Sequence, residues 1–221
     1  MSSGLKIKSQ GEETYQKVRD AITYGKLNPG ERLVEHQVCE SFQVGRTPLR
    51  EALRRLQTEG YVDFVPNKGV TISKLSIEDV EQIYDIIAIL EGYAAEVAAR
   101  RLTKEGIQAL TSLHHKMIDL NAEQDFKTWL EHNTLFHAHI VQAGGNRHLS
   151  KLITGLRDRL YRYRFLSVTI LGQSEKYSDD HEKILTALRG KKAQQAGKSM
   201  RDHVNYVAEF MIGLLRQSPG L

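Results

Sequence analysis

Strand-forming sequence is confined to one short stretch of this chain, and that restriction decides its fold class. Residues 61–65 and 70–73 are rich in Val, Tyr, Phe, Thr and Ile and flank a Pro-Asn-Lys-Gly turn, which is the pattern of a β-hairpin. Beyond Leu75, apolar residues recur only at the three- and four-residue spacing of helices. The sequence therefore predicts a mainly α protein with a single hairpin near the end of its first third.

Three helices are predicted ahead of the hairpin, at residues 12–24, 34–42 and 47–60. Asn28-Pro29-Gly30 supplies turn chemistry after the first helix, and Val44-Gly45 separates the second from the third. Helix, helix, short turn, helix and hairpin is the element order of a winged helix-turn-helix. Residues 1–75 are therefore predicted to form a DNA-binding domain of this kind.

The remaining residues, 76–221, are predicted to form an all-α helical bundle. Ser76 and Asp79 open its first helix as a capping box in which Asp replaces the usual Glu or Gln, and Thr103 caps the second. Glycines at 144, 145, 172 and 190 separate the later helices. The predicted helices span residues 76–101, 103–121, 125–143, 146–166, 174–189 and 193–216.

The helix predicted at 47–60 carries two different faces. Arg46, Arg50 and Arg54 recur every four residues and so form one stripe, while leucines at 49, 53 and 56 form another. The planar fork of arginine matches guanine edges and phosphate oxygens, and Thr47 lies in the first turn, where backbone N–H groups suit phosphate. The pattern predicts a recognition helix; the alternative is a solvated arginine face on an ordinary surface helix.

Charge and composition agree with a DNA-binding first part. Residues 1–74 hold 12 Lys and Arg against 9 Asp and Glu, whereas the rest holds 19 against 18. The hairpin turn carries Lys68 and Gly69, which suit a wing that reaches the minor groove. The single cysteine, Cys39, excludes an internal disulfide, and no apolar run approaches the roughly 20 residues of a membrane span. With a polar start and no leader visible, we expect a cytoplasmic protein without a membrane partner.

The first part resembles the GntR family of bacterial regulators over roughly residues 12–73. The resemblance is carried by the segments Leu-Asn-Pro-Gly-Glu-Arg-Leu at 27–33, Val-Gly-Arg-Thr-Pro-Leu-Arg-Glu-Ala-Leu-Arg-Arg-Leu at 44–56 and Glu-Gly-Tyr-Val at 59–62. It implies that Arg46 and Arg50 read or clamp operator DNA and that Gly69 lies on the wing. His36 falls where some relatives carry a DNA-contacting arginine.

Histidines are concentrated in the second part, which holds eight of the nine. Asn133 and His137 are four residues apart and share a helix face, while His181 and His203 belong to two later helices. Three imidazoles and one oxygen ligand gathered in a bundle would suit a divalent ion such as zinc or nickel. The alternative for each histidine is a surface position or a core position with its hydrogen bonds satisfied.

Residues 76–216 resemble the ligand-binding domain of the FCD subgroup of GntR regulators. The matching pieces are Leu-Glu-Gly-Tyr-Ala-Ala at 90–95, Phe-His-Ala-His-Ile at 136–140, Ala-Gly-Gly-Asn at 143–146 and His-Glu-Lys-Ile at 181–184. The resemblance implies a metal held by Asn133, His137, His181 and His203, with an effector, often a carboxylate, bound beside it.

Two departures from that subgroup matter. Asn133 is neutral where many relatives have aspartate, and Ile87 stands where many carry a pocket arginine. Four arginines on one later helix could take over the role of an effector clamp: Arg157, Arg159, Arg162 and Arg164. Their alternative role is a solvated or dimer-facing surface.

The sequence as a whole predicts a homodimeric repressor that binds operator DNA and responds to a small organic acid bound near the metal. A metal-dependent hydrolase built on the same histidines is one alternative, although the chain has neither the HExxH motif nor a recognisable nucleophile elbow. A DNA-binding regulator that needs no ligand is the other.

Overall fold

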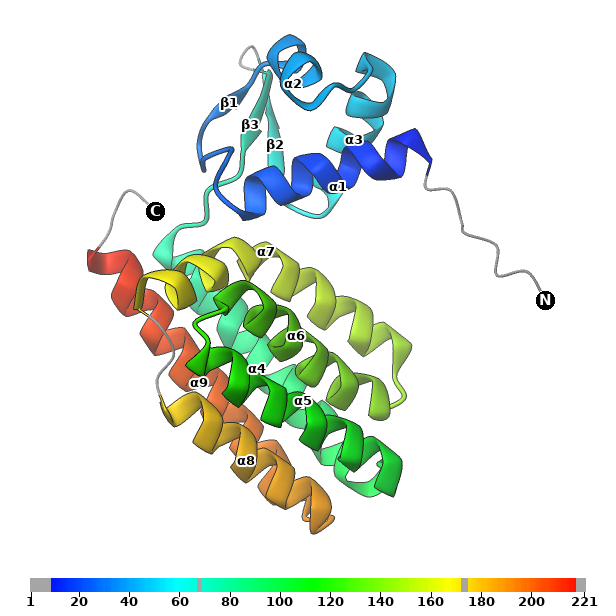
Figure 1. Cartoon of the computed structure of the whole chain (residues 1–221), viewed down its shortest axis with the longest axis vertical. Helices are drawn as coiled ribbons and strands as arrows, with labels where there is room; N and C mark the ends of the chain where they lie inside the picture. The colour runs from blue at the N-terminus through cyan, green and yellow to red at the C-terminus, as the bar shows by residue number, and fades with distance from the viewer. Residues whose placement is uncertain (1–8, 67–68, 172–174, 218–221) are drawn as a thin grey trace, which may run out of the picture. The chain divides into compact units, whose positions relative to one another are not determined.

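The computed structural model describes residues 9–66, 69–171 and 175–217, and the chain divides into two compact units after Lys74. The first unit contains α1 (Gln10–Thr23), β1 (Arg32–Leu33), α2 (Glu35–Phe42), α3 (Arg46–Thr58), β2 (Val62–Val65) and β3 (Gly69–Ile72). Figure 1 shows its helices beside a small sheet. The predicted order of helices and hairpin strands is confirmed.

The sheet of the first unit is antiparallel and has the strand order β1-β3-β2 in the described residues. Its extra strand, β1, pairs Arg32 with Thr71 and Leu33 with Val70. Two residues are too few to show an alternating pattern, so this strand was not predicted from the sequence. Gly69 begins β3 with φ +81°, a conformation that glycine adopts without steric cost.

The core of the first unit is built around the leucine stripe of α3. Leu49, Leu53 and Leu56 are fully buried and pack in one cluster with Val18 and Ile22 of α1. Each of these apolar side chains stabilises the fold by about 1.5–3 kcal/mol through burial. Because the leucines anchor α3, its opposite face is fixed toward solvent.

The second unit is an all-α bundle, so the predicted fold class is confirmed. Its helices are α4 (Ile77–Arg101), α5 (Lys104–Ala122), α6 (Phe126–Ala143), α7 (Arg147–Leu171), α8 (Glu175–Arg189) and α9 (Ala193–Gln217). The predicted capping box is present: Ser76 Oγ accepts from Asp79 N at 3.0 Å, and the Asp79 carboxylate accepts from Ser76 N at 2.9 Å. Helix α7 continues past the predicted end at 166 because Ser167 and Val168 are buried in the bundle.

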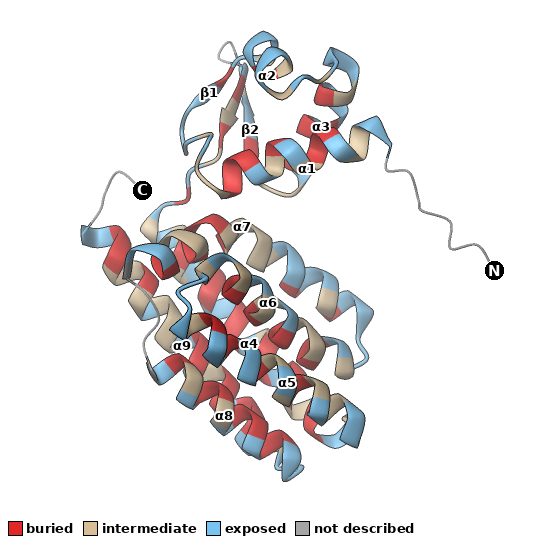
Figure 2. Ribbon diagram, in the orientation of Figure 1, coloured by how far each residue is buried: buried red, intermediate tan, exposed pale blue. Residues whose placement is uncertain are grey.

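Helix α4 lies at the centre of the bundle and positions the site described below. It packs most extensively against α9 and also contacts α6, α7 and α8. Residues coloured as buried lie along the facing sides of these helices (Figure 2). A polar group on the inner face of α4 is therefore enclosed by neighbouring helices. In the described part of the chain, no helix has both the length and the apolar character of a membrane span.

Candidate functional site

The exposed face of α3 carries the side chains that the sequence assigned to DNA. Arg46, Thr47, Arg50 and Arg54 are all exposed, opposite the buried leucines. Arg50 Nε donates to Glu35 Oε2 of α2 at 2.9 Å. The two predicted stripes are thus separate in space, and the guanidinium groups face solvent.

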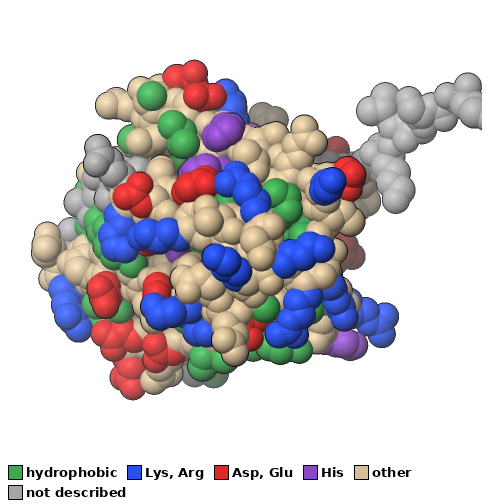
Figure 3. Space-filling view, turned by 90° about the horizontal axis from the view of Figure 1, so that it is seen from below, with side chains coloured by type: hydrophobic (Ala, Val, Ile, Leu, Met, Phe, Trp, Pro, Cys, Tyr) green, Lys and Arg blue, Asp and Glu red, His purple; other side chains and the backbone are tan. Residues whose placement is uncertain are grey.

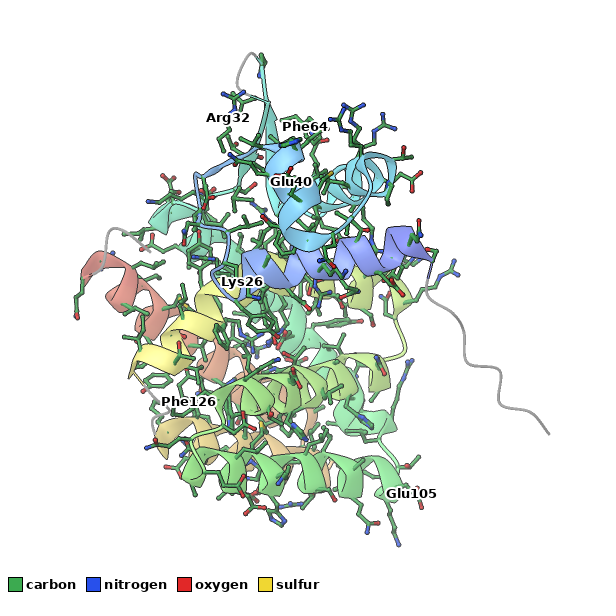
Figure 4. All side chains as sticks on the ribbon, turned by 45° about the horizontal axis from the view of Figure 1, so that its top comes forward. Lys26, Arg32, Glu40, Phe64, Glu105 and Phe126 are labelled. Atoms are coloured by element: carbon green, nitrogen blue, oxygen red, sulfur yellow. The ribbon has the colours of Figure 1, made fainter. Side chains whose placement is uncertain are left out.

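The other DNA-contact candidates lie in different parts of the first unit. His36 is exposed on α2, with its Nε2 3.3 Å from Glu40 Oε1. Gly69 is exposed at the start of β3, whereas Lys68 lies outside the described residues. Figure 4 labels two exposed residues on the strands that the sequence analysis did not single out, Arg32 and Phe64.

Basic residues outside this stripe have other roles. The Arg55 guanidinium lies 3.6 Å from the centre of the Tyr15 ring and pairs with Glu12 and Glu59, so it ties α3 to α1. Seen from below, Lys and Arg side chains are also spread over the bundle (Figure 3). A basic surface by itself therefore does not distinguish a DNA-binding face in this protein.

The bundle brings three of the predicted metal ligands together. His137 of α6, His181 of α8 and His203 of α9 are each at most 2% exposed, and their candidate ligand atoms all lie within 4.8 Å of one another. The ring centroids of His181 and His203 are 4.6 Å apart, and those of His137 and His203 are 5.3 Å apart. Residues separated by up to 66 positions in the sequence thus share one site.

The chemistry of this cluster fits a divalent metal ion. His181 Nε2 and His203 Nδ1 are buried without a hydrogen-bond partner in the described residues. Burial, aided by the positive charge of Arg157, lowers the pKa of His137 to about 4, and burial lowers the pKa of His181 and His203 well below the usual value. Neutral imidazoles with unsatisfied ring nitrogens are the form in which histidine binds zinc.

A buried carboxylate that the sequence analysis did not assign supports the cluster. Glu91 of α4 is fully buried; Arg157 donates to it through Nε and through Nη2, the latter at 2.6 Å. His137 Nδ1 lies 2.8 Å from Glu91 Oε2. Burial acts to raise the pKa of Glu91, but Arg157 and His137 outweigh it and hold the pKa far below its ordinary range. The ionised carboxylate accepts a hydrogen bond from the Nδ1–H group of His137, which leaves Nε2 free to bind a ligand.

A small cavity adjoins the histidines. Its volume is about 20 Å³. The residues that line it include Asn133, His137, His203, Tyr84 and Arg164. The Asn133 carbonyl oxygen, predicted to bind metal, accepts from Arg164 Nη2 at 2.6 Å. Arg164 Nη1 and the Tyr84 hydroxyl are buried and have no hydrogen-bond partner in the described ranges. The cavity therefore presents unused donors, which suit an anion.

Two of the four candidate effector arginines of α7 line the cavity, and the other two do not. Arg157 and Arg164 are seven residues apart, about two helical turns, and both line the cavity. Arg159 and Arg162 are not among its lining residues; Arg159 interacts electrostatically with Asp79. A second cavity of about 60 Å³ between α6 and α7 also touches His137 and Arg157. Arg157 thus stands between the two spaces.

Comparison with known proteins places this architecture in a family. Residues 10–72 match the family model for bacterial regulatory proteins of the gntR family, and residues 82–206 match the FCD domain. The chain is similar to an uncharacterised HTH-type transcriptional regulator of Bacillus subtilis, YdhC, at 29% identity over 92% of this chain and 91% of that protein. It is 27% identical to the HTH-type transcriptional repressor GlaR of Escherichia coli, over 86% of this chain and 90% of GlaR.

A solved structure shows the same fold. The E. coli protein McbR/YncC superimposes with a TM-score of 0.81 and 20% sequence identity, covering 94% of this chain and 99% of that one. The predicted family resemblance is confirmed. The chain belongs to the GntR family of DNA-binding transcriptional regulators and carries an FCD domain behind its winged helix-turn-helix.

Proposed function

We propose that this regulator is a metabolite-responsive repressor whose effector is a small anion bound beside the histidine cluster. The observation that carries the proposal is the pair of unused buried donors, Arg164 Nη1 and the Tyr84 hydroxyl, which line the same cavity as His137 and His203. An unpaired buried donor costs about 1–3 kcal/mol, and an anionic ligand with two or more oxygens would remove that cost.

A divalent ion, zinc or nickel, would be held by His137, His181 and His203. Glu91 fixes the ring of His137, and Asn133 or a water molecule would complete the ligand set. When bound, the ion supplies positive charge and a coordination position for an effector oxygen, such as that of a carboxylate. Arg164 and Arg157 would orient the anion through charge-assisted hydrogen bonds.

A metabolite screen tests the effector half of this proposal. Thermal shift with zinc and small carboxylates such as citrate and malate identifies stabilising compounds, which are then added to the protein–operator complex. We expect a hit to weaken operator binding by roughly 5- to 150-fold, the usual range of allosteric coupling. Compounds that stabilise Arg164→Gln as much as the wild type would place the effector elsewhere.

The proposed DNA-binding function predicts a palindromic operator, whose bases are read in part by Arg50. Selection from random DNA should enrich one motif with two half-sites. Arg50→Ala should weaken operator binding by roughly 1–3 kcal/mol and relax the base preference at one position of each half-site. Lys26→Ala, which removes an exposed positive charge elsewhere in the same unit, is the control and should leave the preference unchanged. Failure of the wild type to enrich any motif would contradict the proposal.

We propose that the homodimer forms through the outer face of α4. Ile86, Ile89 and Tyr93 recur on one side of this helix and are 47%, 65% and 55% exposed, although the opposite side of α4 is buried in the bundle. A second copy of the same face would cover them, and two DNA-binding units per operator require two chains.

Ile89→Glu should therefore convert the dimer into a monomer, because it would place two charges in the apolar contact. Light scattering of the full chain at micromolar concentration measures this. Leu135→Glu on α6, where the side chain is 54% exposed, is the control and should leave the dimer intact. A monomeric wild type, or a dimer that persists in Ile89→Glu, would rule out this interface.

A further inference from the structure

Glu35 and Arg50 join the two helices of the helix-turn-helix through a side-chain ion pair. Glu35 is the first residue of α2, and Arg50 lies in the second turn of α3. Arg50 Nε donates to Glu35 Oε2 at 2.9 Å, and the two side chains are 65% and 33% exposed. A negative charge thus lies directly beside the arginine stripe that faces DNA.

Arg50 differs in this respect from its neighbours on the stripe. Arg46 and Arg54 lie one turn before and after it, and no ion pair is recorded for either within the described residues. Arg50 is therefore the arginine of this stripe whose orientation is restrained by a second helix.

The choice of nitrogen in this ion pair matters for base reading. A guanidinium carries five N–H donors, and the bond to Glu35 occupies the one on Nε. The two terminal nitrogens remain, and their parallel donors match O6 and N7 of guanine. A side chain that is already oriented loses less conformational freedom when it binds.

A carboxylate at the position of Glu35 would also repel the phosphates of bound DNA. Affinity for DNA of any sequence comes mainly from neutralised phosphates, and a nearby negative charge reduces it. On the operator, the guanine contact of a pre-oriented Arg50 would offset this reduction in affinity. On other sequences Arg50 has no matching guanine, so the reduction in affinity would remain.

We propose that Glu35 is a specificity-determining positioning residue, which orients Arg50 toward one guanine and weakens binding to all other sequences. This role rests on the proposed reading of DNA by Arg50. Glu35 need not contact DNA for the effect, because it acts through the arginine and through its own charge.

The test compares full-length wild type, Glu35→Gln and Glu51→Gln. Glu51 is exposed and follows Arg50 in α3, and its substitution removes one negative charge without touching the ion pair. Fluorescence anisotropy measures affinity for the selected operator and for a duplex altered at the position where Arg50→Ala relaxes the base preference. Circular dichroism confirms that each variant is folded.

Glu35→Gln should bind the altered duplex more tightly, and its discrimination between the two duplexes should fall by roughly tenfold, within the range of one arginine–guanine contact. Glu51→Gln should tighten binding to both duplexes equally and keep the ratio. Combining Glu35→Gln with Arg50→Ala should reduce discrimination no further than Arg50→Ala alone.

An unchanged discrimination ratio in Glu35→Gln would overturn the assignment of Glu35; equal loss of affinity for both duplexes, which a purely structural role would give, is one such result. These outcomes differ from failure of the proposed function. In that case the wild type itself would select no motif.

Discussion

His203→Ala should lose the bound metal ion, whereas His114→Ala should retain it. His203 is one of three clustered imidazoles, and its Nδ1 is buried without a hydrogen-bond partner in the described residues. His114 is also buried, and its ring lies 6.0 Å from that of His181, but it is not part of the cluster. Elemental analysis should find about one ion per chain in wild type and in His114→Ala, and far less in His203→Ala. Equal metal content in the two variants would refute the ligand assignment.

Removal of the ion should also destabilise the second unit. Its proposed ligands come from α6, α8 and α9, so the ion would link three helices. A free ion at 100 times its Kd stabilises by about 2.7 kcal/mol, which corresponds to roughly 5–10 °C in Tm for a protein of this size. Calorimetry with and without chelator measures the difference, and His203→Ala should show none.

Metal occupancy of the folded protein should fall only as the pH drops below the ordinary histidine range, because protons compete for the ligands near their lowered pKa. The free histidines of the unfolded chain protonate near ~6.5, whereas burial keeps the pKa of His137 at about 4 in the folded protein. A folded pKa below the unfolded one means that stability is present above pH ~6.5 and is lost as the pH falls toward 4. Lowering the pH therefore reduces the stability of the metal-free fold and also protonates the histidines that would bind the metal.

The second large effect is expected from Arg157→Ala, which should destabilise the second unit by about 3–5 kcal/mol. Glu91 is fully buried and bonded by two nitrogens of Arg157, so the substitution leaves a buried carboxylate without its main counter-charge. Urea unfolding of the full chain measures the loss. Arg159→Ala, on the same helix but away from Glu91, should cost less than about 1 kcal/mol.

Measuring the stability loss of Arg157→Ala at several pH values distinguishes loss of charge pairing from loss of packing. Without Arg157, burial would raise the pKa of Glu91 above its unfolded value, so the neutral acid would become the favoured form. Stability would then be greater below the unfolded pKa and lost as the pH rises, and the deficit relative to wild type should shrink toward pH 5. The double variant Glu91→Gln with Arg157→Met should recover part of the lost stability. A deficit that is the same at all pH values would mean that Arg157 acts by packing alone.

The histidines of the candidate site could be predicted from the sequence, but the buried ion pair that supports them could not. The histidine positions followed from a family resemblance and were brought together by the bundle, yet Glu91 was overlooked. A signal existed: Glu91 lies eight and four residues after Ile83 and Ile87, so it shares the inner face of its helix. A charged residue at that spacing must be paired when buried, and its partner Arg157 is 66 positions away.

The sequence by itself determined the fold class, the helix order and the two stripes of α3, because these depend on periodicity and turn chemistry within a few residues of one another. Only the tertiary structure decided which of the four α7 arginines reach the cavity, that Asn133 is engaged by Arg164, and that Glu35 holds Arg50. These contacts depend on how whole helices are rotated and packed. Rotation and packing are fixed by burial summed over the unit and leave no local pattern in the chain.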